Sequence, residues 1–272
     1  MPTQQEKAEQ LLALHRRGQP LLMPNPWDIG SARLLASLGF AALATTSSGF
    51  AATLGRADGA VTRGEAIGHA AAIVAAVDLP VSADLENCFA DQPDGVAETI
   101  RLALGAGLAG CSVEDYSGSA DAPIYDAGLA ADRVAAAAEI AHSGAVHLVL
   151  TARAENYLHG RADLADTIAR LQAYQQAGAD ALFAPGVTKR DDIAALVGSV
   201  DRPVNVLAMP GTPPVPELAA IGVARISVGG AFAFAALDAV IRAARELRER
   251  GTYSYLDWSR AGRQEAAAIF SG

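Results

Sequence analysis

The sequence contains few lysines and few cysteines, and each shortage narrows the possible functions. Lys7 and Lys189 are the two lysines among 272 residues, and 30 acidic residues against 21 basic ones give a net charge of −9. A surface that binds nucleic acid needs clustered positive charge, so we expect no nucleic-acid partner. The two cysteines, Cys88 and Cys111, are too few for a disulfide framework or a paired-cysteine zinc site, which favours a reducing, cytoplasmic location.

Long hydrophobic runs are also absent from the sequence. No uninterrupted apolar run approaches the roughly 20 residues that a membrane-spanning helix needs, so we expect no membrane association. Residues 1–18 have the pattern of a short polar amphipathic helix and lack the apolar centre of a signal peptide. Hydrophobic residues nevertheless make up 51% of the chain, which is enough for a large core.

Short apolar runs recur at regular intervals, as the strands of a parallel sheet do. The segments between them are rich in alanine and have helical periodicity, most clearly over 64–77, 94–106, 128–142, 163–177 and 231–250. Several of these segments end at a glycine just before the next run, and glycine suits the left-handed cap of a helix. The eight apolar runs cover residues 20–25, 40–48, 80–86, 110–115, 147–155, 181–186, 203–208 and 224–229.

Eight strands that alternate with helices predict an α/β fold of the (β/α)₈ TIM-barrel type, with residues 1–272 forming one domain. Residues 251–272 form a C-terminal helical extension with aromatic side chains, and we expect it to pack against a partner subunit. The alternative topology is a doubly wound open sheet. Its glycine-rich phosphate turn, GxGxxG, is missing, because the chain reads PWDIGSARLL after residues 20–25.

Polar residues gather where the predicted strands end. Asp84 and Glu86 end the third strand, Glu114 lies at the end of the fourth, Arg153 at the end of the fifth, and Asn205 on the seventh. In (β/α)₈ barrels the chemistry takes place at the carboxyl ends of the strands, whereas packing residues fill the interior below them. The distribution therefore predicts an active site at that end of the barrel.

Alternation of side chains along each strand directs several of these groups into one volume. Asp84 and Glu86 share one face of their strand, and Glu114 and Arg153 face the same way on the next two strands. Several carboxylates in one pocket resist ionisation unless a cation is present, and Mg²⁺ binds one or two carboxylates while it keeps several waters. For any single acid of this set, a salt bridge or a helix cap is the alternative interpretation.

Four segments, in this order, resemble the isocitrate lyase/phosphoenolpyruvate mutase superfamily: NPWDIGSARLLASLGFAALATTSSGFAATLGRADG, PVSADLENCF, GLAGCSVED and LTARAENY. The resemblance covers roughly residues 20–240. It implies a modified (β/α)₈ barrel that binds Mg²⁺, with Mn²⁺ as a possible substitute, and a 2-oxo acid or its enolate. It also implies a homotetramer, built from dimers that exchange a C-terminal helix.

The same resemblance assigns a role to each candidate residue. Asp84 matches the direct metal ligand, and Glu86 and Glu114 match acids that act mostly through metal-bound water. Arg153 matches the arginine that binds the substrate carboxylate. The resemblance thus implies metal ligands Asp84, Glu86 and Glu114, catalytic residues Asp58, Glu114 and Arg153, and substrate-binding residues Thr46, Ser47, Ser48, Gly49, Asp84, Arg153 and Asn205.

The loop after the fourth strand departs from the superfamily pattern. Phosphonate mutases carry a lysine there, and the C–C lyases carry a Lys-Cys-Gly-His type segment whose cysteine acts as the general acid. This loop instead reads EDYSGSADAPIYDAG. We therefore expect a reaction that needs less acid–base help, such as decarboxylation, or a substitute among Tyr116, Asp121 and Tyr125. Cys88 also departs from a glycine-rich turn, and we interpret it as a buried residue because no base is identifiable beside it in the sequence.

These observations lead to one leading prediction and two alternatives. The leading prediction is a Mg²⁺-dependent lyase or decarboxylase that acts through an enolate on a small 2-oxo acid of the pyruvate, oxaloacetate or 2-oxoglutarate type. The first alternative is a 2-oxo-acid-binding protein with little or no lyase activity. The second is chemistry on a P–C bond of the phosphonopyruvate type.

Overall fold

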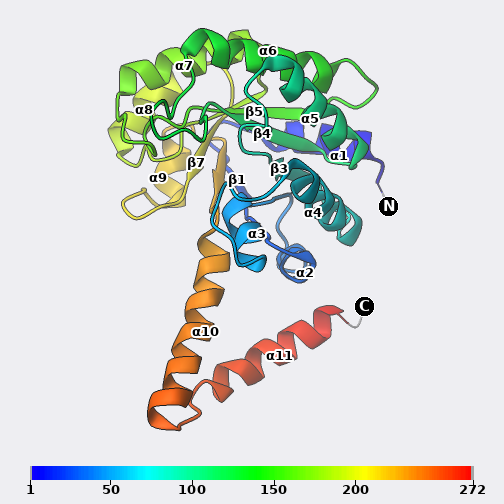
Figure 1. The fold of residues 1–272 in the computed structure, drawn as a ribbon, viewed down its shortest axis with the longest axis vertical. Coiled ribbons are helices and arrows are strands. Elements are labelled where there is room, and N and C mark those ends of the chain that lie inside the picture. Colours follow the sequence, from blue (N-terminus) through cyan, green and yellow to red (C-terminus); the bar gives the residue numbers. More distant parts are fainter. Residues whose placement is uncertain (1, 271–272) are drawn as a thin grey trace.

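The computed structural model describes residues 2–270 and shows a barrel from which two C-terminal helices project (Figure 1). The strands are β1 (Leu21–Met23), β2 (Leu43–Ala44), β3 (Val81–Asp84), β4 (Gly110–Glu114), β5 (Val149–Arg153), β6 (Ala181–Phe183), β7 (Val204–Leu207) and β8 (Arg225–Ser227). The helices are α1 (Gln4–Leu14), α2 (Ile29–Ser37), α3 (Ser47–Thr53), α4 (Arg63–Ala76), α5 (Pro93–Gly105), α6 (Ala127–His142), α7 (Leu164–Gln176), α8 (Arg190–Gly198), α9 (Val215–Ala220), α10 (Ala231–Arg250) and α11 (Leu256–Phe270).

The strands form one parallel sheet that curves into a nearly closed barrel. Each strand from β2 to β7 pairs with the next one in the chain, and β8 pairs with β1. Between β1 and β2, the Ala44 N–H donates a hydrogen bond to the Pro24 carbonyl at 3.1 Å. The return of the last strand to the first confirms the (β/α)₈ prediction and excludes the doubly wound open sheet.

Short sequence signals begin and end the helices around the barrel. Asp28 begins α2 by accepting a hydrogen bond from the Ser31 N–H at 2.6 Å, and the Ser31 hydroxyl accepts from the Asp28 N–H at 3.1 Å. Gly107 and Gly178 follow α5 and α7 with φ of 81° and 105°. These glycines stop each helix and lead into β4 and β6, as the sequence predicts.

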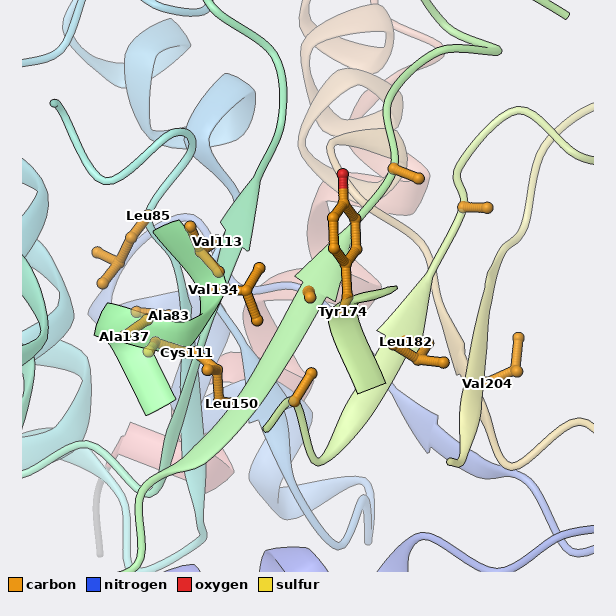
Figure 2. Close-up of a cluster of buried hydrophobic side chains, with 14 of the residues drawn as sticks. Ala83, Leu85, Cys111, Val113, Val134, Ala137, Leu150, Tyr174, Leu182 and Val204 are labelled. Atoms are coloured by element: carbon orange, nitrogen blue, oxygen red, sulfur yellow. The ribbon is translucent and has the colours of Figure 1, made fainter. Parts of the chain in front are cut away.

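Alternation along the strands divides packing side chains from site side chains. On β4, Cys111 and Val113 are fully buried and belong to the same core cluster as Val134 of α6 (Figure 2). Their neighbours Ser112 and Glu114 have the opposite orientation: Ser112 lines the central cavity, and Glu114 contacts a side chain of β5. The outward-facing side chains therefore hold the helices, and the inward-facing ones are free for chemistry.

The second apolar run is shorter as a strand than the sequence predicts. The prediction is residues 40–48, whereas β2 covers Leu43–Ala44 and helix α3 begins at Ser47. Thr46 begins this helix, because its Oγ1 accepts a hydrogen bond from the Gly49 N–H at 3.3 Å. The helices α2, α3, α8 and α9 are too short to give a clear periodic signal.

The C-terminal helices form an arm in which α10 extends away from the barrel and α11 turns back and contacts α2 (Figure 1). The predicted helix over residues 231–250 is confirmed as α10, and α11 occupies most of the predicted extension over 251–272, of which 271–272 lie outside the described residues. Large apolar side chains on the arm stay exposed, including Phe234 at 50% and Val240 at 64%. None of the helices within residues 2–270 is both long and apolar enough to cross a membrane.

Candidate active site

The strands surround a cavity of about 240 Å³ that has side chains from all eight of them in its wall. Most of the sequence-predicted residues line it directly, while Glu86 lines a small adjoining pocket together with Asp84. Glu114 is buried and contacts Arg153. The predicted residues in the cavity wall are Thr46, Ser47, Ser48, Asp58, Asp84, Arg153 and Asn205.

Asp84 connects three elements at the end of β3. One carboxylate oxygen accepts a hydrogen bond from the Ser47 N–H at 3.1 Å, and the other lies 2.7 Å from Nη1 of Arg153. The Asp84 N–H in turn donates to Oγ1 of Thr45 at 2.9 Å. These contacts fix the carboxylate between the start of α3 and the end of β5.

Arg153 lies among three carboxylates. Its Nη1, Nη2 and Nε atoms contact Asp84 at 2.7 Å, Glu114 at 3.1 Å and Glu155 at 2.8 Å. Burial opposes the charged form of Arg153, but the negative charges of Glu114, Glu155 and Asp84 raise its pKa well above the usual value. One guanidinium therefore faces three acids, which leaves a local excess of negative charge.

Burial and this negative charge together raise the pKa values of three acids at the site. Burial raises the pKa of Glu114 well above the usual range, and Arg153 opposes the shift. Burial, followed by the charges of Asp84 and Asp58, raises the pKa of Glu86 to about 7. Asp58 lies at the rim of the cavity with part of its side chain exposed, and desolvation followed by the charge of Asp84 also raises its pKa, although the Ser47 hydroxyl opposes the shift.

Glu86 reaches the site from a turn and not from the strand itself. Strand β3 ends at Asp84, and Glu86, Cys88 and Phe89 have φ of 50°, 58° and 55°. Buried hydrogen bonds hold this turn, because the Thr99 hydroxyl donates to the Cys88 carbonyl at 2.6 Å and Arg133 donates to the Asn87 carbonyl at 2.7 Å. Strand alternation thus predicted correctly that Glu86 lies near Asp84, but Glu86 belongs to a turn and does not continue the strand.

Cys88 is a packing residue, as the sequence indicates. Its side chain is 0% exposed, and burial raises the pKa of its thiol to about 12. A thiol that stays protonated and is closed to solvent is a poor nucleophile.

Two amides of the predicted Thr46–Gly49 turn have partners within the protein. The Ser47 N–H donates to Asp84, and the Gly49 N–H donates to Thr46 at the start of α3. A Cβ at Gly49 would lie 2.6 Å from Cγ2 of Thr46, so this close approach requires glycine. The Ser47 and Ser48 side chains line the cavity.

The floor of the cavity contains polar groups that the sequence reasoning missed. Asn205 of β7 was predicted, and its Nδ2 donates to Oγ of Ser227 on β8 at 2.9 Å. Arg225, two residues before Ser227, also lines the cavity and is 4% exposed. The signal that could have found it is the alternation in ARISVG, which places Arg225 and Ser227 on one face.

A family model described as phosphoenolpyruvate phosphomutase matches residues 11–248. The chain belongs to this family. A structure from Burkholderia cenocepacia of a protein described as a candidate lyase/mutase has 54% identity, covers 93% of this chain and 92% of that one, and superposes with a TM-score of 0.91. An uncharacterised protein of Mycobacterium tuberculosis is 35% identical over 238 residues, 87% of this chain and 88% of its own. An oxaloacetate decarboxylase of Chromohalobacter salexigens is 29% identical over 260 residues, 91% of this chain and 88% of its own.

Membership of the phosphoenolpyruvate phosphomutase family places the chain in the predicted isocitrate lyase/phosphoenolpyruvate mutase superfamily.

The loop after β4, residues 115–126, departs from the superfamily pattern in sequence and lies away from the cavity. Among the described residues in the cavity wall, none comes from 115–126. Tyr116 stacks on His159 with 3.7 Å between ring centroids. Tyr125 donates to Asp91 at 2.5 Å and lies under the guanidinium of Arg133, and burial raises its pKa to about 12. These contacts hold Tyr125 outside the cavity wall, so it has a structural role and is not the substitute acid.

The acids at the mouth of this barrel suit a hard divalent cation. Asp84, Glu86 and Asp58 offer carboxylate oxygens, the ligand type that Mg²⁺ prefers. Desolvation, followed by the charges of neighbouring acids, raises the pKa values of Glu86 and Asp58, and a bound cation would oppose both shifts. Asp84 and Glu86 are the residues that would hold the cation, with Glu114 behind them.

A second group of metal-ligand types lies away from the cavity. His142 and His147 both contact Asp180, each with 3.0 Å between its Nε2 and a carboxylate oxygen. The two rings are stacked, with centroids 4.0 Å apart and planes 4° from parallel, so their nitrogen lone pairs do not converge on one point. This arrangement fits two N–H donors on one carboxylate, and it is not the predicted Mg²⁺ site.

Proposed function

We propose that the chain is a Mg²⁺-dependent enzyme that cleaves a C–C bond of a small 2-oxo acid through an enolate, with decarboxylation as the simplest reaction. The observation that carries the proposal is the contact of Arg153 with Asp84 and Glu114 at the mouth of the barrel, beside two further acids, Glu86 and Asp58, whose pKa values are raised. We propose that a cation and a substrate carboxylate bind next to one another among these residues.

The proposed chemistry divides between the cation and the chain. Bound Mg²⁺ supplies positive charge that stabilises the enolate oxygen. Arg153 lines the cavity and binds the substrate carboxylate. When the C–C bond breaks and carbon dioxide leaves, the bonding electrons form the enolate, and the Asp58 carboxyl group returns a proton to carbon. The raised pKa of Asp58 suits it to carry that proton.

Two observations favour decarboxylation within this class. The described loop at 115–126 contains neither lysine nor cysteine and does not reach the cavity wall, so it offers no strong acid–base group there. Decarboxylation needs one proton transfer, from Asp58 to the product carbon, so it requires no acid or base from this loop. The similarity to an oxaloacetate decarboxylase over 91% of this chain agrees with this choice.

The same loop motivates a second candidate function, a 2-oxo-acid-binding protein with little turnover. Calorimetry with pyruvate, oxaloacetate and 2-oxoglutarate, each with and without Mg²⁺, tests both candidates. We expect Mg²⁺-dependent binding of at least one acid, and proton NMR of the same mixture should then show conversion to a product lacking one carboxyl group. Binding without conversion would favour the binding protein, and no binding would overturn both.

The family's name makes P–C chemistry the remaining alternative. Phosphonopyruvate incubated with the protein and Mg²⁺, followed by phosphorus NMR, addresses it directly. We expect the phosphonate signal to stay unchanged. Appearance of free phosphate or of a phosphate ester would replace our proposal with phosphonate chemistry.

We also propose that the arm formed by α10 and α11 joins subunits, as the resemblance implies, in a dimer of helix-exchanged dimers. The support is its exposed apolar surface. Trp258 and Phe270 are 49% and 47% exposed, and Leu237 and Ile241 on α10 are 42% and 45% exposed. A large exposed apolar surface of this kind marks a protein–protein contact.

A further inference from the structure

The cavity floor holds a buried positive charge that the proposed chemistry does not use. Arg225 begins β8 and is 4% exposed, yet it lines the same cavity as Asp84 and Arg153. Its Nη1 atom contacts Oγ1 of Thr151 and Nε2 of His15, each at 3.1 Å. A hydroxyl and a neutral imidazole satisfy hydrogen bonds but do not neutralise a cation.

Arg225 differs in this respect from Arg153 and Arg170. Arg153 contacts three carboxylates, and Arg170 contacts Asp115 and Asp166. Arg133 is also buried and has no carboxylate partner among residues 2–270, but it donates to four backbone carbonyls, those of Asn87, Ala90, Asp91 and Glu114. Within residues 2–270, no carboxylate forms a salt bridge with Arg225, and its buried Nε has no hydrogen-bond partner. A buried, uncompensated charge is costly, so such a group usually has a partner.

The surroundings of Arg225 increase this cost. Burial, followed by the positive charge of Arg153, lowers the pKa of Arg225 to about 9. An anion between the two arginines would relieve both effects. The cavity of about 240 Å³ provides the space, since a water molecule takes up about 30 Å³ of liquid and a four-carbon acid has the bulk of several waters.

Other polar groups at the floor suit the same occupant. Asn205 and Ser227 are 2% and 6% exposed and line the cavity beside Arg225. The Asn205 Oδ1 is buried without a hydrogen-bond partner, while Nδ2 donates to Ser227. A flip of this amide would put Nδ2 in the place of the unpartnered Oδ1 and let the Ser227 hydroxyl donate to Oδ1. The floor can thus present a guanidinium and an amide to one anion.

We propose that Arg225, together with Asn205 and Ser227, binds the second carboxylate of a dicarboxylic 2-oxo acid. The inference rests on the proposed function and narrows its substrate class. The 2-oxo acid end lies near Asp84 and Arg153 at the mouth of the barrel, and the distal carboxylate lies at the floor. In oxaloacetate this distal carboxylate is the group that decarboxylation releases as carbon dioxide, so Arg225 recognises the substrate and takes no part in stabilising the enolate. A monocarboxylic acid such as pyruvate would leave Arg225 without a partner, so the site discriminates in favour of oxaloacetate-type acids.

The first test compares ligands in the unaltered protein. Oxaloacetate and 2-oxosuccinamate have nearly the same shape, but the second has an uncharged amide in place of the distal carboxylate. Dissociation constants with Mg²⁺ present come from calorimetry, or KM values where a ligand is turned over. We expect oxaloacetate to bind at least about 10-fold more tightly than the amide and than pyruvate, because charged hydrogen bonds contribute more than neutral ones. Equal affinities would overturn the inference.

The second test uses variants of the floor. Arg225→Gln removes the charge, Arg225→Lys keeps it, and Arg202→Gln is a control on the exposed surface. Arg225→Gln should weaken oxaloacetate binding at least about 10-fold and change pyruvate binding less than about 2-fold, while Arg225→Lys keeps part of the preference. Melting temperatures show which variants fold, and if Arg225→Gln does not, the ligand comparison in the unaltered protein still decides.

The outcomes separate this inference from the proposed function. If the unaltered protein binds no 2-oxo acid with Mg²⁺, the proposed function fails. If it binds oxaloacetate and pyruvate, and Arg225→Gln weakens both equally or neither, this inference alone fails. Phosphonopyruvate distinguishes the two possible distal anions: weaker binding than oxaloacetate supports the carboxylate, and tighter binding that depends on Arg225 would assign the floor to a phosphonate.

Discussion

The guanidinium of Arg153 and the carboxylate of Asp84 form a salt bridge of 2.7 Å that links β5 to β3 across the mouth of the barrel. The bridge crosses over β4, whose Glu114 contacts the same guanidinium at 3.1 Å. Both partners are largely buried, with side-chain exposures of 15% for Arg153 and 18% for Asp84. A cation or an anion that enters the cavity would compete with one partner of this salt bridge. Mutation of Asp84 or Arg153 therefore tests the proposed site directly.

Replacement of Asp84 by alanine should abolish function. The variant loses the carboxylate proposed to hold Mg²⁺ and the acceptor of the Ser47 N–H. We expect turnover to fall at least about 100-fold, since the charge that stabilises the enolate is lost, and calorimetry should show no Mg²⁺-dependent binding of the substrate. Asp201→Ala, at an exposed site, is the control. Full activity of Asp84→Ala would exclude the proposed metal site.

Replacement of Arg153 by glutamine should destabilise the fold in a pH-dependent way. It leaves Asp84, Glu114 and Glu155 without their shared partner. Breaking a buried charge network costs about 3–5 kcal/mol, which urea unfolding at neutral pH measures. The deficit should shrink as the pH falls, because buried carboxylates without the arginine bind protons more readily than in the unfolded chain. A deficit that grows at low pH would contradict this account.

The cysteines should be unreactive in the native protein. Cys88 and Cys111 are both 0% exposed, and burial raises the pKa of Cys88 to about 12 and that of Cys111 well above its usual value. A thiol-specific reagent should therefore label no cysteine in the folded protein and both in denaturant, with activity unchanged by the treatment of the folded form. Rapid labelling of one thiol with parallel loss of activity would instead identify a catalytic cysteine.

His15 should make stability depend on pH in the mildly acidic range. Its Nδ1 contacts the Leu11 carbonyl of α1 at 2.8 Å and its Nε2 accepts from Arg225 of β8, while Asp180 acts on it more weakly. Burial, followed by the charge of Arg225, lowers its pKa from 6.5 to about 4. Between these values the unfolded chain binds more protons, so the stabilising contribution is complete above pH 6.5 and is lost as the pH falls toward 4.

The comparison that isolates this effect is His15→Gln, because glutamine does not titrate and can still accept a hydrogen bond from Arg225. Relative to this variant, the unaltered protein should lose about 3 kcal/mol of unfolding free energy between pH 6.5 and 4. Urea denaturation at a series of pH values measures the difference. Parallel stability curves for the two proteins would show that His15 is not buried as a neutral group.

Strand alternation was sufficient to predict much of the candidate site. It placed Asp84, Glu114 and Arg153 on facing positions of three strands, and their side chains do contact one another. It failed where backbone geometry depends on distant residues. The turn at Glu86 has a positive φ that hydrogen bonds from Thr99 and Arg133 hold in place, and such contacts have no local signal in the sequence.

Arg225 escaped prediction for a different reason. An arginine at the start of a strand is ordinarily a solvated charge, and only the closed barrel shows that this one is buried beside Asn205 and Ser227. Its Thr151 and His15 partners lie 74 and 210 residues away in the sequence. The absence of an acidic partner for a buried arginine can therefore be recognised in the folded structure but not in the sequence.

Removal of residues 252–272 should change the assembly without removing the cavity. The truncation deletes α11, which contributes Trp258 and Phe270 to the exposed apolar surface of the arm, and leaves the strands intact. Light scattering after gel filtration should show the unaltered protein as a tetramer and the truncated chain as a smaller species, because the exchanged helix no longer buries apolar area. Val240→Asp, which adds a charge at a site 64% exposed on α10, should have the same effect with the chain length unchanged. Arg202→Gln on the barrel surface should leave the mass unaltered. A monomeric unaltered protein would show that the arm serves another purpose.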